Sequence, residues 1–161
     1  MSGIIAAAIA VLGTLLGAVV AHRYQEKSAA RATARAERER SHQRLLDACA
    51  DFAALAEEYR RAQYDRWTSR QAPPGSETAL AARAESYRLY VEVRSSLFRL
   101  RLVATAPQAR RLAEHAAEIQ VKTREIFFAS DRDDMLARGE VAEQACEAFV
   151  LRAREVLAAG D

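Results

Sequence analysis

The 161-residue sequence contains few residues that interrupt helices, with only 3 prolines and 6 glycines, and 7% of it is aromatic. So few breakers argue against an all-β chain. Phosphate-binding glycine loops are absent, because neither G-x-x-x-x-G-K-[ST] nor G-x-G-x-x-G occurs. Half of the residues are hydrophobic and the net charge is +2, which argues against disorder of the whole chain. The composition predicts an all-α protein with one core.

Cysteine is also scarce, since Cys49 and Cys146 are the only two in the chain. Such widely spaced thiols make neither a disulfide scaffold nor a zinc knuckle. In the antiparallel bundle derived below, their heights would differ by ~10 Å, which exceeds the reach of a disulfide. We expect both cysteines to be small buried side chains.

Convergent catalytic or metal-binding groups are not evident either. His115 and Glu118 are three residues apart and could share a helix face, but a single pair of this kind is usually a solvated patch. Asp131, Asp133 and Asp134 stand where a helix should begin, and carboxylates there complement the helix dipole. We therefore expect no enzymatic activity, no cofactor and no metal site.

The longest apolar run occupies residues 3–21 and contains no charge, Asn, Gln or Pro. As a helix it would span ~28 Å, close to the ~30 Å hydrocarbon core of a bilayer. The run predicts a single transmembrane helix. A cleaved secretory signal is the alternative, with a weak site at Val19–Ala21, but no basic residue precedes the run and it is longer than usual.

The segment after the run, residues 22–44, is basic and has no apolar stripe, so it predicts a helical stalk. Its seven basic residues outnumber three acidic ones, for a charge of +4. They are Arg23, Lys27, Arg31, Arg35, Arg38, Arg40 and Arg44. The positive-inside bias places this side in the cytoplasm and the N-terminus outside, in the cell membrane. We expect these residues to contact anionic lipid headgroups; direct nucleic-acid or partner contact is disfavoured but stays open.

Small residues in the predicted span suggest a second role for it. Gly13 and Gly17 form G-x-x-x-G, a pattern that lets two transmembrane helices pack closely. Homodimerisation through this face is one reading, and a chance pattern in an alanine-rich span is the other.

Residues 45–161 predict an antiparallel four-helix bundle, giving the domain organisation 1–21 anchor, 22–44 stalk and 45–161 bundle. The first bundle helix carries a seam at Leu45, Cys49, Phe52, Ala56, Tyr59 and Gln63 and stops at Ala72–Gly75. The second should bury Leu80, Ala84, Tyr87, Val91, Leu97 or Phe98, and Leu102, with Tyr90 beside them. The third should bury Leu112, Ala116, Ile119, Thr123 and Ile126–Phe127, and the fourth Met135–Leu136, Ala142, Ala145–Cys146, Phe149, Ala153 and Val156–Leu157.

Caps mark the expected starts of the last three helices. Ser76–Thr78 should begin the second, Thr105 with Gln108 forms a capping-box spacing before the third, and Ser130 with Asp133 precedes the fourth. Arg94, Arg99, Arg101, Arg110 and Arg111 form a basic patch around the turn after the second helix, which should face the membrane. Tyr59, Tyr64 and Trp67 are expected in the core.

Residues 9–18, IAVLGTLLGA, followed by an Arg/Ala/Glu stalk and an alanine-rich helical domain, resemble the small KilB-like membrane proteins of actinomycete conjugative plasmids and their chromosomal relatives. The resemblance implies a helper role in plasmid spread and no catalytic residues.

Two function classes follow. The first is a non-catalytic, membrane-anchored helical protein that binds protein partners, as an accessory factor in plasmid spread. The alternative is a regulatory bundle that relays a signal through the stalk, although two residues before the span leave no room for an outer input domain. An enzyme that uses the bundle interior lacks a convergent polar set.

Overall fold

A computed structural model describes the backbone of residues 2–73 and 75–159, and the side chains of residue 25 and of residues 29–73 and 75–159. It contains the helices α1 (Ser2–Thr68), α2 (Glu77–Val103), α3 (Pro107–Glu125) and α4 (Arg132–Ala158), with the short 3-10 turns η1 (Ser69–Gln71) and η2 (Ile126–Phe128). The described residues contain no strand, which confirms the all-α class.

The chain divides into two compact units, Met1–Ser41 and His42–Asp161. In the first unit, every side chain from residue 29 to residue 41 is exposed, as expected of a segment without an apolar stripe. The predicted span, residues 3–21, lies outside the residues whose side chains are described. Among those that are described, no helical stretch combines the length and apolarity needed to cross a membrane.

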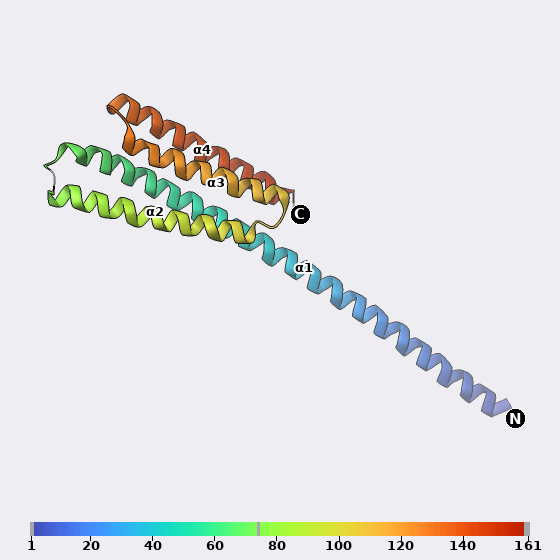
Figure 1. The fold of residues 1–161 in the computed structure, drawn as a ribbon. Helices are drawn as coiled ribbons and strands as arrows, with labels where there is room; N and C mark the ends of the chain where they lie inside the picture. Colours follow the sequence, from blue (N-terminus) through green and yellow to red (C-terminus); the bar gives the residue numbers. More distant parts are fainter. Residues whose placement is uncertain (1, 74, 160–161) are drawn as a thin grey trace. The chain divides into compact units, whose positions relative to one another are not determined.

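The second unit is a bundle in which the part of α1 from His42 onward lies beside α2, α3 and α4 (Figure 1). Short loops join the helices, so successive helices run antiparallel. Its core takes side chains from all four, including Phe52 of α1, Val93 of α2, Ile119 of α3 and Phe149 of α4. Phe52 and Phe149 pack edge to face with ring centroids 5.3 Å apart.

Three of the four predicted seams are confirmed. On α1 the buried residues include Cys49, Phe52, Ala56, Tyr59 and Gln63. On α3 they include Leu112, Ala116, Ile119 and Thr123. On α4 they include Met135, Ala142, Cys146, Phe149 and Ala153, whereas Leu136 is exposed. The seam predicted for α2 is wrong and is described with the surfaces below.

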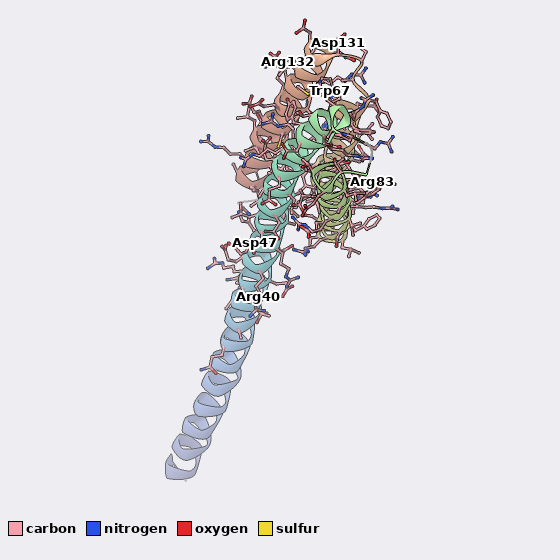
Figure 2. All side chains as sticks on the ribbon, turned by 90° about the vertical axis from the view of Figure 1, so that its left-hand side faces the viewer. Arg40, Asp47, Trp67, Arg83, Asp131 and Arg132 are labelled. Carbon is pink, nitrogen blue, oxygen red and sulfur yellow. The ribbon has the colours of Figure 1, made fainter. Side chains whose placement is uncertain are left out.

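The loops define the two ends of this bundle. At the end that we call distal, Gly75 adopts a positive φ of 83°, which glycine tolerates, in the loop between η1 and α2. The indole N–H of Trp67 donates to the carbonyl of Ala129 over 3.0 Å, tying the end of α1 to the loop before α4. Figure 2 shows Trp67 close to Asp131 and Arg132 at this end. The proximal end carries His42 and the loop between α2 and α3.

The helix starts agree only in part with the predicted caps. Ser76 caps α2, with its hydroxyl accepting from the N–H of Ala79. Helix α3 begins with Pro107 in its first turn, as expected, but its N-cap is Ala106 and makes no side-chain bond, so the capping box at Thr105 is wrong. The N-cap of α4 is Asp131, one residue later than predicted at Ser130. An extended Ala106 before proline explains the first correction, because proline disfavours helical backbone in the preceding residue.

Candidate interaction surfaces of the bundle

Helix α2 turns a different face into the bundle from the one that its largest apolar residues predicted. Its buried residues are Ser86, Leu89, Val93, Ser96, Leu97 and Leu100. The predicted seam is exposed apart from Leu97. Leu80, Tyr87, Val91, Phe98 and Leu102 are each between 46% and 80% exposed. We call the exposed row the α2 stripe, defined as Leu80, Ala84, Tyr87, Val91, Phe98 and Leu102.

The reason for this correction lies in the charges around the stripe. At ~100° per residue the stripe and the buried row occupy opposite sides of α2. Arg83, Arg94 and Arg101 lie close to the stripe, and burying them would leave three charges without partners at high cost. The buried row offers Ser86 instead, whose hydroxyl satisfies a polar group of α1. Packing therefore favoured the row with smaller and fewer apolar side chains.

One edge of the stripe carries arginines without carboxylate partners. Arg83, Arg94 and Arg101 are spaced 11 and 7 residues apart, so they fall on the same edge, which we call the arginine edge. Arg83 lies 5.7 Å from the ring centroid of Tyr87, and Arg94 and Arg101 lie 5.5 and 5.9 Å from that of Phe98. In the described part of the chain, no carboxylate makes an ion pair with any of the three. This spacing was visible in the sequence, but the sequence interpretation missed it.

The opposite edge of the stripe is neutralised within the bundle. Arg88 pairs with Glu85 over 2.5 Å and with Glu92 over 2.6 Å. Arg99 pairs with Asp51 of α1 over 2.8 Å. Of the basic patch predicted around this turn, Arg94, Arg99, Arg101, Arg110 and Arg111 are all exposed, and its orientation toward a membrane stays a prediction.

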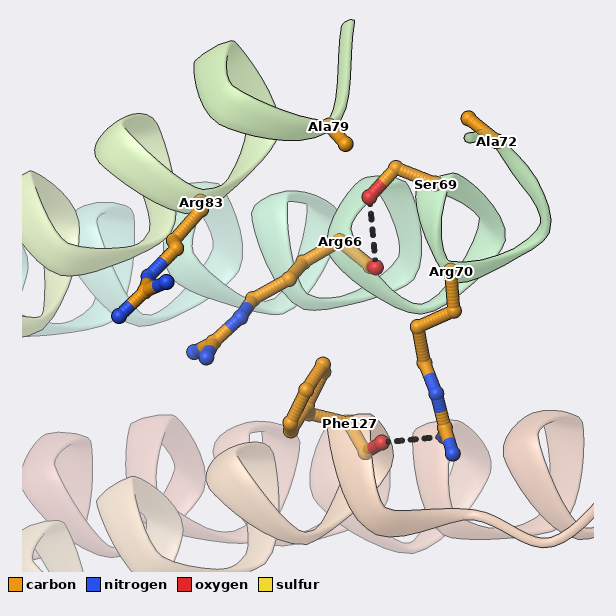
Figure 3. A pocket seen from close by; sticks show the side chains of 7 residues that line it. All are labelled: Arg66, Ser69, Arg70, Ala72, Ala79, Arg83 and Phe127. Atoms are coloured by element: carbon orange, nitrogen blue, oxygen red, sulfur yellow. Dashed lines mark hydrogen bonds between the residues drawn. The ribbon is translucent and has the colours of Figure 1, made fainter. Parts of the chain in front are cut away.

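An open pocket of about 420 Å³ lies at the distal end and is lined by Arg66, Ser69, Arg70, Ala72, Ala79, Arg83 and Phe127. We call it the arginine pocket. Figure 3 shows Arg66 and Arg83 extending toward the same space and Arg70 reaching down to the backbone of Phe127. The guanidinium of Arg66 lies 3.9 Å from the ring centroid of Phe127, and Arg70 donates to the carbonyls of Phe127 and Ala129 over 3.0 and 3.2 Å. No carboxylate belongs to the described lining.

A chain of buried polar groups leads from the core to this pocket. The amide nitrogen of Gln63 donates to the hydroxyl of Tyr59 over 2.5 Å, and the hydroxyl of Ser86 donates to the amide oxygen of Gln63 over 3.3 Å. Arg66 in turn donates to Ser86 over 3.5 Å. Burial raises the pKa of Tyr59 to about 12. Gln63 and Ser86 thus join α1 to α2 and hold Arg66 at the inner edge of the pocket.

Tyr59 is buried, and Tyr64 and Trp67 are half-buried, which confirms their predicted place in the core.

Both cysteines are buried as free thiols, also as predicted. Desolvation raises the pKa of each thiol to about 11. Cys49 borders an apolar groove of about 320 Å³ between α1 and α4 at the proximal end. High pKa values keep both thiols protonated and unreactive near neutral pH.

The polar residues considered for chemistry have structural partners. His115 lies 3.8 Å from Glu118 and contacts the guanidinium of Arg152. Asp131 caps α4 by accepting from the N–H of Asp134 over 2.9 Å. Hydrogen bonds from Arg138 and from the backbone of Ser130 lower the pKa of Asp134. Over the described side chains, no group of three or more potential ligands could hold a metal ion.

The predicted lipid-facing residues are described only in part. Arg31, Arg35, Arg38, Arg40 and Arg44 are exposed, and Arg40 lies 3.7 Å from Glu37. Arg23 and Lys27, and the glycines Gly13 and Gly17 of the predicted helix-packing face, lie outside the residues whose side chains are described. Their contacts with lipid or with a second chain stay predictions.

Together these residues define an all-α bundle domain that presents an exposed apolar stripe, an arginine edge and an arginine-lined pocket. A family model for the KilB plasmid transfer protein matches residues 46–157. Because the match covers more than half of the 161 residues, the chain belongs to the KilB plasmid transfer protein family. The family implies a role in plasmid transfer, and the resemblance stated from the sequence is confirmed at this level. Searches of curated proteins and of solved structures find no match.

Proposed function

We propose that this protein is a membrane-anchored, non-catalytic accessory factor of plasmid transfer, and that its bundle binds a partner protein through the α2 stripe. The observation that carries the proposal is the exposure of five large apolar side chains along one helix face, within the region that the KilB family model matches. Contiguous exposed apolar surface of this kind marks interaction sites.

The chemistry of the surface favours one kind of partner, an amphipathic helix with carboxylates along one edge. The stripe repeats at spacings of three, four and seven over residues 80–102, the periodicity of helix-on-helix packing. Three arginines on a single edge complement glutamates or aspartates of such a helix. A second copy of α2 fits less well. Packed antiparallel, it would set one arginine edge against the other, and packed parallel, it would set the arginine edge against an edge whose carboxylates already pair with Arg88.

The apolar run of residues 3–21 and the basic segment after it support the anchor. A span of this length would hold the bundle at the inner face of the membrane, with Arg23, Lys27 and the other basic residues on the anionic headgroups. Confinement to the membrane raises the effective concentration of the bundle for partners located there. Gly13 and Gly17 would allow two anchors to pack against each other.

The test compares plasmid transfer frequency for Val91→Asp with that for Val121→Asp. Val91 is 62% exposed on the stripe, whereas Val121 is 53% exposed on α3, so both variants add one carboxylate at a surface valine. We expect Val91→Asp to lower transfer at least tenfold and Val121→Asp to leave it nearly unchanged. Equal transfer frequencies for both variants would show that the α2 stripe is not needed for plasmid transfer.

Charge reversal on the arginine edge tests whether an acidic helix of another protein binds the α2 stripe. Arg94 and Arg101 replaced together by Glu should block transfer, and suppressors should replace Asp or Glu with Lys or Arg on a helix of another transfer protein. A photoreactive residue at position 91 that crosslinks only a second copy of this chain would contradict the proposal that the partner is a different protein. Suppressors confined to this chain would do the same.

A further inference from the structure

Three arginines line the pocket at the distal end, and none of its described lining residues carries a negative charge. Arg66 comes from α1, Arg70 from η1 and Arg83 from α2, and all three line one open volume of about 420 Å³. Like charges around one volume repel one another, and an anion bound among them would reduce that repulsion. The arginine edge of α2 includes Arg83 but neither Arg66 nor Arg70, so the proposed partner surface does not account for the three arginines together.

Two of the guanidiniums are held in place by the fold. Arg66 stacks 3.9 Å from the centroid of Phe127 and bonds to Ser86 at the end of the buried polar chain. Arg70 is held by two backbone carbonyls. A planar guanidinium has five N–H donors, so both retain donors beyond these contacts. Binding would therefore require little further ordering of these side chains.

The geometry points to a phosphate group as the ligand of the arginine pocket, and we propose that the pocket binds the terminal phosphate of a small phosphorylated molecule. Arginine forks pair with the oxygens of phosphate through charge-assisted hydrogen bonds. A terminal phosphate carries more charge than a backbone diester, which suits three cations. The pocket volume lies within the ~300–1,000 Å³ of small-molecule sites.

Trp67, the only tryptophan in the chain, offers a readout. Its indole N–H donates to the carbonyl of Ala129, and Arg70 donates to the same oxygen. The experiment titrates pyrophosphate, and then inorganic phosphate, into the full-length chain in neutral detergent and follows tryptophan fluorescence. We expect a saturable change at millimolar concentrations or below, with sodium chloride at equal ionic strength producing none.

Arg83→Gln is the decisive variant, because Arg83 is exposed and its loss leaves the core intact. Its pyrophosphate affinity should fall by about 10- to 100-fold, the range for one lost hydrogen bond to a charged group. Arg88→Gln is the matched control. It removes the same charge from the same helix, at a side chain paired with Glu85 and Glu92, and should keep the affinity of the parent.

The other outcomes decide against the proposal. No saturable change with either phosphate, or equal weakening by Arg83→Gln and Arg88→Gln, would show that no phosphate site exists here. Binding of a single-stranded oligonucleotide without binding of pyrophosphate would replace the small ligand with a nucleic-acid backbone. Val91→Asp should leave pyrophosphate affinity unchanged, so failure of the pocket and failure of the α2 stripe are distinguishable.

Discussion

At the residue scale, Gly139 of α4 leaves room for the side chain of Tyr64 on α1. A Cβ at this position would overlap the hydroxyl and ring of Tyr64. Alanine would gain up to ~1 kcal/mol of helix propensity, but the displaced tyrosine should cost more, about 1–3 kcal/mol for an overpacked site. We expect Gly139→Ala to lower the free energy of unfolding in urea.

A double-mutant cycle separates these two effects. In a Tyr64→Ala background the overlap is gone, so the same Gly139→Ala change should stabilise the chain by up to ~1 kcal/mol. A stabilising Gly139→Ala in the presence of Tyr64 would show that the tyrosine turns aside without cost.

Three buried groups predict a loss of stability at alkaline pH. The folded-state pKa is raised to about 11 for Cys49 and Cys146 and to about 12 for Tyr59. In the unfolded chain these groups ionise first, at ~8.5 for cysteine and ~10 for tyrosine. Their contribution is therefore fully present below pH ~8.5 and is lost as pH rises through the folded values. Urea midpoints should fall from about pH 9 upward.

Two variants show which side chains cause this loss of stability at alkaline pH. One combines Cys49→Ala with Cys146→Ala, and the other is Tyr59→Phe. The cysteine variant should flatten the fall that begins near pH 9, and the Tyr59→Phe variant should flatten the part above pH 10. Midpoints compared across pH within each variant remove the constant cost of the substitution itself. An unchanged pH slope in both variants would mean that other groups cause the loss.

At the scale of single helices, α4 depends on a cap that the sequence interpretation placed one residue too early. Asp131 accepts from the N–H of Asp134, while Ser130 caps nothing and instead donates its own N–H to Asp134. Asp131→Ala should therefore lower the free energy of unfolding by about 1 kcal/mol. Asp133→Ala is the matched control, because Asp133 is an acidic residue in the same turn that does not cap the helix. It should lower the free energy of unfolding by less. Chemical denaturation measures both, and an equal cost would show that only the dipole matters.

Helix α2 explains why prediction from sequence succeeded for three helices and failed for the fourth. Helices α1, α3 and α4 each carry one apolar row, so periodicity alone identified Phe52, Ile119 and Phe149. Helix α2 carries two rows on opposite sides, and the larger side chains of the wrong one suggested the core. The position of the charged residues decides between the rows, because Arg83, Arg94 and Arg101 lie beside the exposed one.

The surfaces were less predictable than the core. The arginine pocket joins Arg66, Arg70, Arg83 and Phe127 from different segments, and no local spacing relates them. Its assembly requires the pairing of α1 with α2 and the return of η2 beside η1, which are tertiary facts. By contrast, the burial of both cysteines followed from residue type alone.

For the whole molecule, the family match and the apolar run identify different parts of the chain. The match covers residues 46–157, whereas the most specific stretch of the sequence resemblance was residues 9–18. The family assignment therefore concerns the bundle, and the proposed membrane anchor is inferred from the N-terminal run. Because residues 29–41 have only exposed side chains, the bundle should not need them for stability. A chain of residues 38–161, which leaves one helical turn for fraying before His42, should unfold within about 0.5 kcal/mol of the full chain.

Vesicle flotation of three forms of the chain divides membrane binding among the apolar run, the basic segment and the bundle. The full chain should float with neutral vesicles and resist high salt, because burial of residues 3–21 does not depend on charge. Residues 22–161 should float only with anionic vesicles and be released as salt screens the headgroups. Residues 38–161 should float with neither, since the α2 stripe is proposed to bind a helix. If residues 38–161 float and Val91→Asp abolishes that flotation, the α2 stripe binds lipid rather than a partner helix. If the full chain does not float, the proposed membrane anchor is wrong.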